Sequence, residues 1–138
     1  MTHVSIKNLT KIYPGSTEPS LDDLSLEIES GSLTALLGPS GCGKTTTMKM
    51  IAGLLGQTSG DVTFDERSIL NDKPEQRGVV MVFQNHLLFP YMSVADNIGF
   101  GLKMRKVDKA EIHSRVIEML DLVKLPDLGQ RRPRELSG

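Results

Sequence analysis

Apolar and polar residues alternate along three stretches in the first half of the chain, residues 4–13, 24–28 and 60–64. In the second stretch, Leu24, Leu26 and Ile28 fall on one side and the polar residues on the other. A period of two is typical of strands that bury one face and leave the other in water. The pattern therefore predicts an antiparallel β subdomain near the N-terminus.

Two other stretches are almost continuously apolar. They are residues 33–37, with the sequence LTALL, and residues 79–83, with the sequence VVMVF. A strand that is covered on both faces has no position that favours a polar side chain. Each stretch is therefore predicted to be a fully buried strand.

Helical spacing replaces alternation elsewhere. After a glycine-rich segment, Met48, Ile51 and Leu55 recur on one helix face. Ser93 is followed three residues later by Asp96, which is typical of a helix N-cap with an acid at its third position.

The same signal returns in residues 108–111, and Pro126 is expected to stop the helix that follows. The apolar stripe of that helix is formed by Ile112, Val116, Leu120 and Val123.

Strand patterns fill roughly the first 85 residues and helical patterns roughly the last 50, which predicts an α/β chain in two parts. We expect residues 1–86 to hold a β subdomain and the core around the glycine-rich segment. Residues 87–138 are expected to form a helical subdomain.

Composition narrows the possible functions. Sixteen Lys and Arg against seventeen Asp and Glu give a net charge of −1, which argues against a general electrostatic grip on nucleic acid or anionic lipid. Two Tyr, four Phe and no Trp make an aromatic nucleic-acid platform an unfavourable hypothesis. A single cysteine, Cys42, excludes an internal disulfide and fits a reducing compartment. The chain shows no apolar signal core and no run of the ~18 residues that span a bilayer, so we expect a soluble or peripheral protein.

The glycine-rich segment from Gly38 to Thr45, GPSGCGKT, matches G-x-x-x-x-G-K-[ST] in full. Glycines allow a tight turn in which successive backbone N–H groups point at phosphate oxygens, and the following helix adds the positive end of its dipole. Lys44 can reach the β- and γ-phosphates, and the Thr45 hydroxyl can bind Mg²⁺. A chance match is the alternative, but the strand pattern before the segment and the helix pattern after it favour a phosphate loop. Cys42 occupies a free position of the motif and is interpreted as a small filler.

Three further stretches accompany this loop: KIYPG, VVMVFQNHLLFPYMSVADNI and RRPRELSG. Together with GPSGCGKTTTMKMIAGLL, they resemble the ATP-binding subunit of an ABC transporter, and more narrowly the subunits of bacterial importers for sugars and polyamines. The resemblance covers the chain from Val4 to Gly138. It implies a P-loop NTPase fold whose core sheet is incomplete in these residues.

The resemblance also implies the roles of individual residues. Tyr13 would stack on adenine, with an ordinary aromatic residue at the end of a strand as the less favoured alternative. Gln84 would approach Mg²⁺ and the attacking water, so that Lys44 and Gln84 would be the catalytic residues and Thr45 and Gln84 would bind the metal. Ser137 and Gly138 would contact the ATP held by a second subunit. The phosphates would be lined by Gly38, Pro39, Ser40, Gly41, Cys42, Gly43, Lys44, Thr45 and Thr46.

Partners follow from the same resemblance. The apolar segment Asn85–Met92 would dock on a transmembrane permease subunit, or it folds into a small core of its own, because both have this composition. His86 within it is interpreted as a surface residue. A second ATP-binding subunit would complete the nucleotide sites, and the protein would sit at the cytoplasmic face of the inner membrane as a peripheral subunit.

The family's acidic strand, with an Asp for Mg²⁺ and a Glu for water, has no counterpart here, and neither has the later switch histidine. Asp61, Asp65 and Asp72 do not follow a long apolar strand. We therefore expect a truncated form of a longer subunit, one that folds poorly and hydrolyses ATP only at background rate. Two alternatives stay open: a nucleotide-binding fragment without turnover, and a small P-loop kinase whose lid would be RRPRE. A third alternative is an ABC ATPase that belongs to a soluble assembly instead of a transporter. The apolar segment Asn85–Met92 argues against it.

Overall fold

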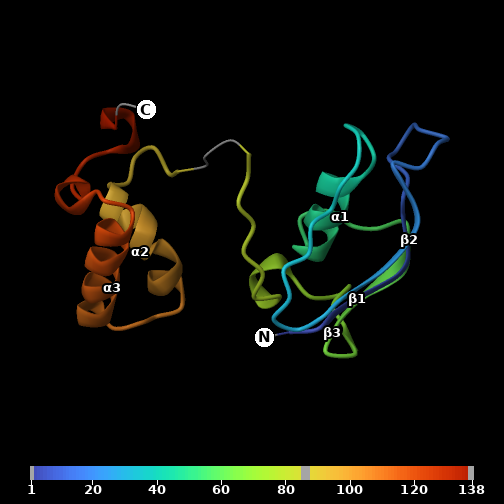
Figure 1. Cartoon of the computed structure of the whole chain (residues 1–138), viewed down its shortest axis with the longest axis horizontal. Coiled ribbons are helices and arrows are strands. Elements are labelled where there is room, and N and C mark those ends of the chain that lie inside the picture. Colours follow the sequence, from blue (N-terminus) through green and yellow to red (C-terminus); the bar gives the residue numbers. More distant parts are fainter. Residues whose placement is uncertain (1, 85–87, 137–138) are drawn as a thin grey trace. The chain divides into compact units, whose positions relative to one another are not determined.

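The computed structural model describes residues 2–84 and 88–136. The chain forms two compact units, Met1–Val82 and Phe83–Gly138, and each is described here by itself. The division falls after Val82, whereas the sequence pattern placed it after residue 86. The first unit contains the sheet and α1, and the second contains α2 and α3 (Figure 1).

The first unit is built on a four-stranded sheet in the order β2-β1-β3-β4, with every neighbouring pair antiparallel. The strands are β1 (Val4–Lys11), β2 (Leu21–Ile28), β3 (Ser59–Phe64) and β4 (Arg67–Ser68). The three strands predicted from alternation are confirmed. β2 begins earlier than predicted, at Leu21, because Ser20 N donates to Lys11 O at 2.8 Å and the two chains stay paired to that point.

The centre of the sheet contains a close crossing between β1 and β3. The β1 register shifts between Ile6 and Leu9, and Asn8 within the shift has a φ of +49°. Gly60 lies against this bulge with a φ of +89°, and a Cβ on it would be 2.6 Å from the Asn8 carbonyl carbon and from Leu9 Cα. Only glycine fits there without moving backbone.

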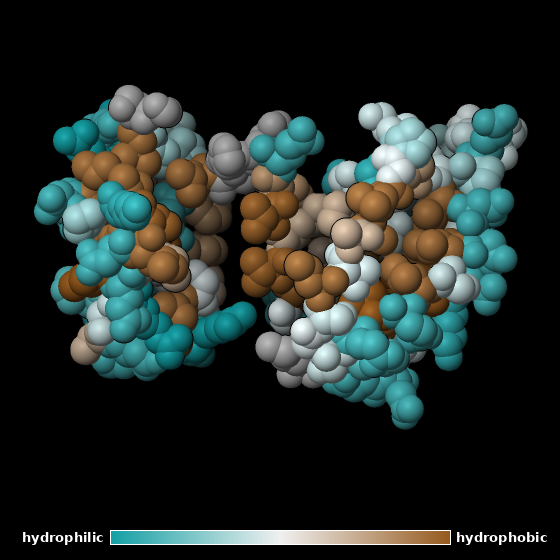
Figure 2. All heavy atoms as spheres, viewed as in Figure 1, coloured by the Kyte–Doolittle hydropathy of each residue, from teal (hydrophilic) through white to brown (hydrophobic). Residues whose placement is uncertain are grey.

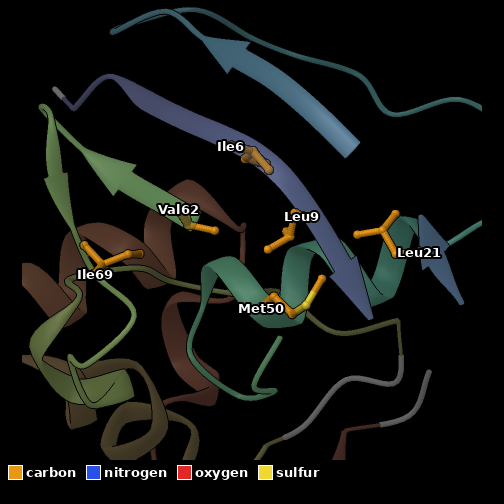
Figure 3. Close-up of a cluster of buried hydrophobic side chains, with 6 residues drawn as sticks. All are labelled: Ile6, Leu9, Leu21, Met50, Val62 and Ile69. Atoms are coloured by element: carbon orange, nitrogen blue, oxygen red, sulfur yellow. The ribbon is translucent and has the colours of Figure 1, made fainter. Parts of the chain in front are cut away.

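One face of the sheet packs on α1 (Lys44–Ile51), the helix that follows the glycine-rich segment. Figure 3 shows the buried cluster between them. Its members are Ile6, Leu9, Leu21, Met50, Val62 and Ile69. Ile6, Leu9, Val62 and Ile69 are fully buried, so this small core holds the sheet and the helix in one body.

The two continuous apolar stretches are not buried strands, and that prediction is wrong for this structure. Neither 33–37 nor 79–83 belongs to a strand, and the exposed fractions of Leu33 and Leu37 are 101% and 90%. Val80 and Val82 are similarly 81% and 89% exposed. A buried strand needs a hydrogen-bonded neighbour at its edges, and the described residues provide none beside these segments. Figure 2 shows the resulting hydrophobic surface on this unit.

The second unit is an antiparallel pair of helices followed by a C-terminal segment, the residues after Leu122. Its helices are α2 (Val94–Met104) and α3 (Lys109–Leu122). Both predicted N-caps are confirmed: Ser93 Oγ accepts from Asp96 N at 3.0 Å, and Asp108 Oδ2 accepts from Ala110 N at 2.8 Å.

The end of α3 differs from the prediction. The helix stops at Leu122, before Pro126, because the chain turns at Lys124 with a φ of +61°. Val123 is therefore 51% exposed and does not join the predicted stripe. Pro126 instead begins a short 3₁₀ turn, Pro126–Leu128.

The helices pack through Val94, Val116 and Leu120, which are buried together. Gly99 allows close approach, since a Cβ on it would lie 3.0 Å from Ile112 Cγ2. The C-terminal segment accepts hydrogen bonds from two N–H groups at the start of α2: Val94 N donates to Arg131 O, and Ala95 N donates to Gly129 O, each at 2.8 Å. In the described part of the chain, no helix is long and apolar enough to cross a bilayer.

Candidate nucleotide-binding site

The glycine-rich segment forms a loop that ends at the first residue of α1. Gly43 is the N-cap of α1 with a φ of +88°, and Gly41 has a φ of +87°. A Cβ on Gly43 would lie 2.9 Å from both Leu21 Cδ1 and Ser20 O. Glycine is therefore required at Gly43 by both backbone conformation and space, and the loop is held against the start of β2.

The Lys44 side chain folds into this loop. Its Nζ donates to Gly38 O and Pro39 O at 2.7 Å each and lies 3.3 Å from Cys42 Sγ. There is no acidic residue in the first turn of α1 to neutralise this ammonium group. The charge is therefore fixed at the mouth of the loop, beside the positive end of the helix dipole, where an anion is favoured.

Cys42 contributes shape to the loop. Its Sγ lies 2.6 Å from the position that a Cβ on Gly38 would occupy, so Gly38 and Cys42 fit together only because the former is glycine. The sulfur thus lies beside Gly38 in an exposed residue, and its role as a small filler stays an interpretation.

Thr47 is a supporting residue that the sequence analysis missed. It is 1% exposed, and its Oγ1 donates to Gly43 O at 2.9 Å. This bond ties the buried face of α1 to the last glycine of the loop. The run of three threonines after Lys44 was the available signal, but only the third is buried. Thr45 is exposed at the helix start and Thr46 is half-buried.

Tyr13 lies in the loop between β1 and β2. The ends of this loop are fastened by the Ser20–Lys11 backbone bond, and Ser20 O also touches the phosphate loop at Gly43. Lys11 Nζ lies 5.4 Å from the centroid of the Tyr13 ring, and the ring is 39% exposed. The structure thus brings the loop that contains Tyr13 to the base of the phosphate loop and leaves its aromatic side chain accessible.

The C-terminal end of α1 is covered by Arg77. Its Nη1 donates to Met50 O at 2.8 Å and to Ile51 O at 3.2 Å, while its Nε donates to Asp72 O at 3.0 Å. Burial lowers the pKa of Arg77, and the nearby Asp72 charge partly opposes this. The sequence gives no sign of this contact, because the partners are 26 and 27 residues apart.

Asp72 also pairs with Arg67, whose Nη2 lies 2.7 Å from Asp72 Oδ2. The hydrogen bond from Arg67 lowers the pKa of the Asp72 carboxyl group, while burial opposes the shift. This pair lies on the surface and does not touch α1.

The remaining predicted site residues, Gln84, Ser137 and Gly138, belong to the second unit. Gln84 is exposed and belongs to the second unit, so its contact with Mg²⁺ stays a prediction. Ser137, Gly138 and the first part of the docking segment, residues 85–87, lie outside the described residues. Among the described residues, no group of three or more His, Cys, Asp or Glu could hold a metal ion.

Residues 88–92, the described part of the predicted docking segment Asn85–Met92, form an exposed loop with two aromatic residues. Leu88, Phe89 and Tyr91 are 46%, 48% and 89% exposed, and the Phe89 ring packs 4.7 Å from that of Phe100. The amide of Asn97 binds the backbone of this loop at Phe89 and Ser93. Phe89 thus packs on α2 while Tyr91 remains in solvent, and docking of this segment on a permease subunit stays a prediction.

A glycine-rich loop that leads into a helix with a lysine at its first residue is typical of the phosphate loop of P-loop NTPases. A profile of the ABC transporter family matches residues 21–138. The chain belongs to this family, and the resemblance seen in the sequence is confirmed.

Proteins with similar sequences support the same family assignment. The chain is 46% identical over 138 residues to the sn-glycerol-3-phosphate import ATP-binding protein UgpC of Bordetella avium. It is 48% identical over 137 residues to the spermidine/putrescine import ATP-binding protein PotA of Thermobifida fusca. It is 44% identical to the diacetylchitobiose uptake system ATP-binding protein MsiK of Streptomyces coelicolor. These alignments cover 98–100% of this chain but only 36–38% of the relatives.

A solved structure is also similar, with a TM-score of 0.83 and 27% identity over 97% of this chain and 63% of the other. It is a dimeric, post-hydrolysis state of the ATP-binding cassette MJ0796 bound to ADP and Pi. The α/β fold of an ABC ATPase is thereby confirmed for the part of the family that this chain spans.

Proposed function

We propose that this chain binds ATP through the loop from Gly38 to Thr46, as part of an ATP-binding subunit of a bacterial solute importer. One observation carries the proposal: the Lys44 ammonium group is held at the mouth of the loop by Gly38 O and Pro39 O. A cation fixed on backbone carbonyls at a helix N-terminus is suited to a triphosphate. The import function rests on the names of the relatives, which are import ATP-binding proteins.

The residues present fit a nucleotide with Mg²⁺. The loop offers backbone N–H groups around Gly41 and Gly43, the Lys44 charge and the exposed Thr45 hydroxyl, which is an oxygen ligand of the kind that Mg²⁺ takes. Thr45 and Gln84 would hold the ion, which supplies charge neutralisation at the phosphates. Tyr13 would stack on the base.

In the reaction, this chain's residues position and stabilise charge, because phosphoryl transfer needs little else from the protein. Lys44 offsets negative charge on the β- and γ-phosphates, and Gln84 orients water, since an amide both donates and accepts hydrogen bonds. Ser137 and Gly138 would act on the nucleotide of a second ATP-binding subunit.

The same proposal places the protein at the cytoplasmic face of the cell membrane as a peripheral subunit. The exposed side chains of Leu88, Phe89 and Tyr91 would meet a permease subunit, as part of the segment Asn85–Met92. Support comes from the apolar exposure of this loop and from the relatives, whose names describe import.

The test is nucleotide binding by the purified chain, measured by titration with a fluorescent ATP analogue and competition with ATP. Lys44→Ala is expected to weaken binding at least tenfold, because it removes the charge fixed at the loop. Lys49→Ala is the matched control: it removes a lysine from the same helix but outside the loop, and it should bind like the unmodified chain. Equal binding by the Lys44→Ala variant would contradict the proposal.

Hydrolysis is a separate measurement. We propose that these 138 residues bind ATP without turning it over, so that phosphate release equals that of the Lys44→Ala control. Turnover well above this control, in protein free of host ATPases, would show that the chain contains its own general base. Phosphoryl transfer to an added acceptor would instead favour the small-kinase alternative.

A further inference from the structure

The side chain of Arg77 makes two hydrogen bonds to the C-terminal end of α1, the helix that starts at the phosphate loop. Its Nη1 donates to the carbonyl oxygens of Met50 and Ile51, which are the last two residues of α1. Neither carbonyl is paired with a residue of α1 itself, and Met50 O also accepts from Gly53 N at 3.1 Å in the turn that follows the helix. Arg77 therefore acts as a side-chain cap on α1 from a distant part of the sequence.

The same guanidinium group is also fixed on its other side. Its Nε donates to Asp72 O, so one planar group bridges the end of α1 and the turn that follows β4. Space is made for it by Gly53: a Cβ there would lie 2.7 Å from Arg77 Nε. Half-burial strengthens the attraction between this positive charge and the negative end of the helix dipole.

The helix that it caps is unusually short. α1 has eight residues, and isolated helices shorter than ~12–15 residues are marginal in water. Fraying from Ile51 needs to cross only about one turn to reach Thr47, whose hydroxyl donates to Gly43 O of the phosphate loop. A cap at one end of so short a helix consequently stabilises the other end.

We propose that Arg77 is a positioning residue for nucleotide binding, which holds α1 at its C-terminus so that the phosphate loop keeps its shape at the N-terminus. The inference rests on the proposed nucleotide site. It assigns no direct contact between Arg77 and the nucleotide.

Arg77 also begins the segment that leads to Gln84. Residues 79–82 of that segment run along α1, where they line a groove of about 190 Å³ with Met48, Ile51 and Ala52. Within the first unit, Arg77 thus joins the phosphate-loop helix to the segment that leads toward the predicted catalytic residue Gln84.

The test compares Arg77→Ala, Arg77→Lys and Arg67→Ala in the full chain. Arg67 is the matched control, because it also binds Asp72 but does not touch α1. Amide hydrogen exchange reports on residues 44–53, titration with ATP gives the Kd, and thermal melting gives the Tm. All binding is measured well below the Tm of every variant.

Arg77→Ala is expected to exchange faster throughout α1, including Thr47, and to raise the Kd for ATP about three- to tenfold among folded molecules. Arg77→Lys keeps the charge but cannot bridge both backbone sites, so it should restore part of the affinity. Arg67→Ala should leave both readouts unchanged. A lowered Tm for Arg77→Ala with an unchanged Kd would mean a purely structural role and would overturn the inference.

Failure of the proposed function gives a different pattern. In that case the unmodified chain binds ATP no better than Lys44→Ala, which rejects the nucleotide role of Arg77 as well. Faster exchange in α1 on Arg77→Ala would then still show that Arg77 caps the helix. If exchange at Thr47 is unaffected while the unmodified chain binds ATP, the coupling along α1 is rejected and the nucleotide site stands.

Discussion

The side chain of Asn97 and the backbone of Phe89 form a pair of hydrogen bonds. Phe89 N donates to Asn97 Oδ1 at 2.7 Å, and Asn97 Nδ2 donates to Phe89 O at 3.2 Å. The same Nδ2 also donates to Ser93 O at 2.8 Å. One amide on α2 therefore closes the loop that presents the exposed Tyr91, much as a backbone strand would pair with it.

This pairing predicts that Asn97→Ala will loosen the loop, because it removes the partner of Phe89 N and leaves Phe89 O with Met92 N alone. Each lost hydrogen bond is worth about 0.5–1.5 kcal/mol, so we expect a loss of ~1–2 kcal/mol in the stability of the helical unit. Cleavage by chymotrypsin next to Phe89 and Tyr91 should speed up. Asn97→Asp keeps the acceptor for Phe89 N, so its stability and its cleavage rate should fall between those of the unmodified chain and of Asn97→Ala. Unchanged cleavage in Asn97→Ala would show that Phe89 is held by its packing on Phe100 instead.

The crossing of β1 and β3 gives a second prediction. Gly60→Ala is expected to destabilise the first unit by more than ~3 kcal/mol, because its Cβ would meet the backbone of Asn8 and Leu9 and its φ of +89° is strained for alanine. Gly15→Ala is the control, since Gly15 has a φ of +83° but nothing within 4 Å. It should cost only ~1 kcal/mol. Urea unfolding of both variants measures the difference, and equal costs would mean that the β-bulge relaxes to make room.

How far the sequence could predict this structure depends on the range of the interactions. Alternation predicted β1 to β3, and the capping residues Ser93 and Asp108 predicted the starts of both later helices, because these signals act within a few residues. The glycine-rich loop and the helix after it were predicted because their motif is contiguous, while phosphate binding by the loop stays a prediction. Arg77 and Asn97 were missed as structural links, because each acts on backbone groups that no local pattern reveals.

The wrong predictions also have a physical cause. The continuous apolar sequence of residues 33–37 and 79–83 indicates that burial would be favourable. A strand is buried only where neighbouring strands and helices cover it, and the local sequence does not show whether they do. The structure leaves Leu33 and Val82 in solvent. Pro126 similarly predicts a stop for α3, whereas the left-handed turn at Lys124 ends the helix first.

The hairpin between β3 and β4 leads to a third prediction. Its two turn residues, Asp65 and Glu66, have φ values of +46° and +69°, as a two-residue type I′ turn requires. Glutamate is strained there, while glycine is not. Glu66→Gly should therefore raise the free energy of unfolding by about 0.5–1 kcal/mol.

Glu66→Ala is the control for that variant, because it shortens the side chain without relieving the backbone. It should give no gain in stability. An equal gain in the two variants would assign the effect to removal of the carboxylate rather than to the turn. Thermal melting in low salt and high salt separates these explanations, since only a charge effect is screened.

The exposed apolar segments give the last prediction. Leu33→Gln and Val82→Thr, made together, should change the free energy of unfolding by less than ~0.5 kcal/mol, because both side chains are already in water. They should also raise the concentration at which the chain stays monomeric, since exposed apolar segments with unpaired backbone groups promote association. Val62→Thr is the matched contrast: Val62 is fully buried, and the substitution should cost ~1–3 kcal/mol. Urea unfolding and light scattering measure the two quantities, and a loss above ~1 kcal/mol in the double variant would show that these segments are packed in solution.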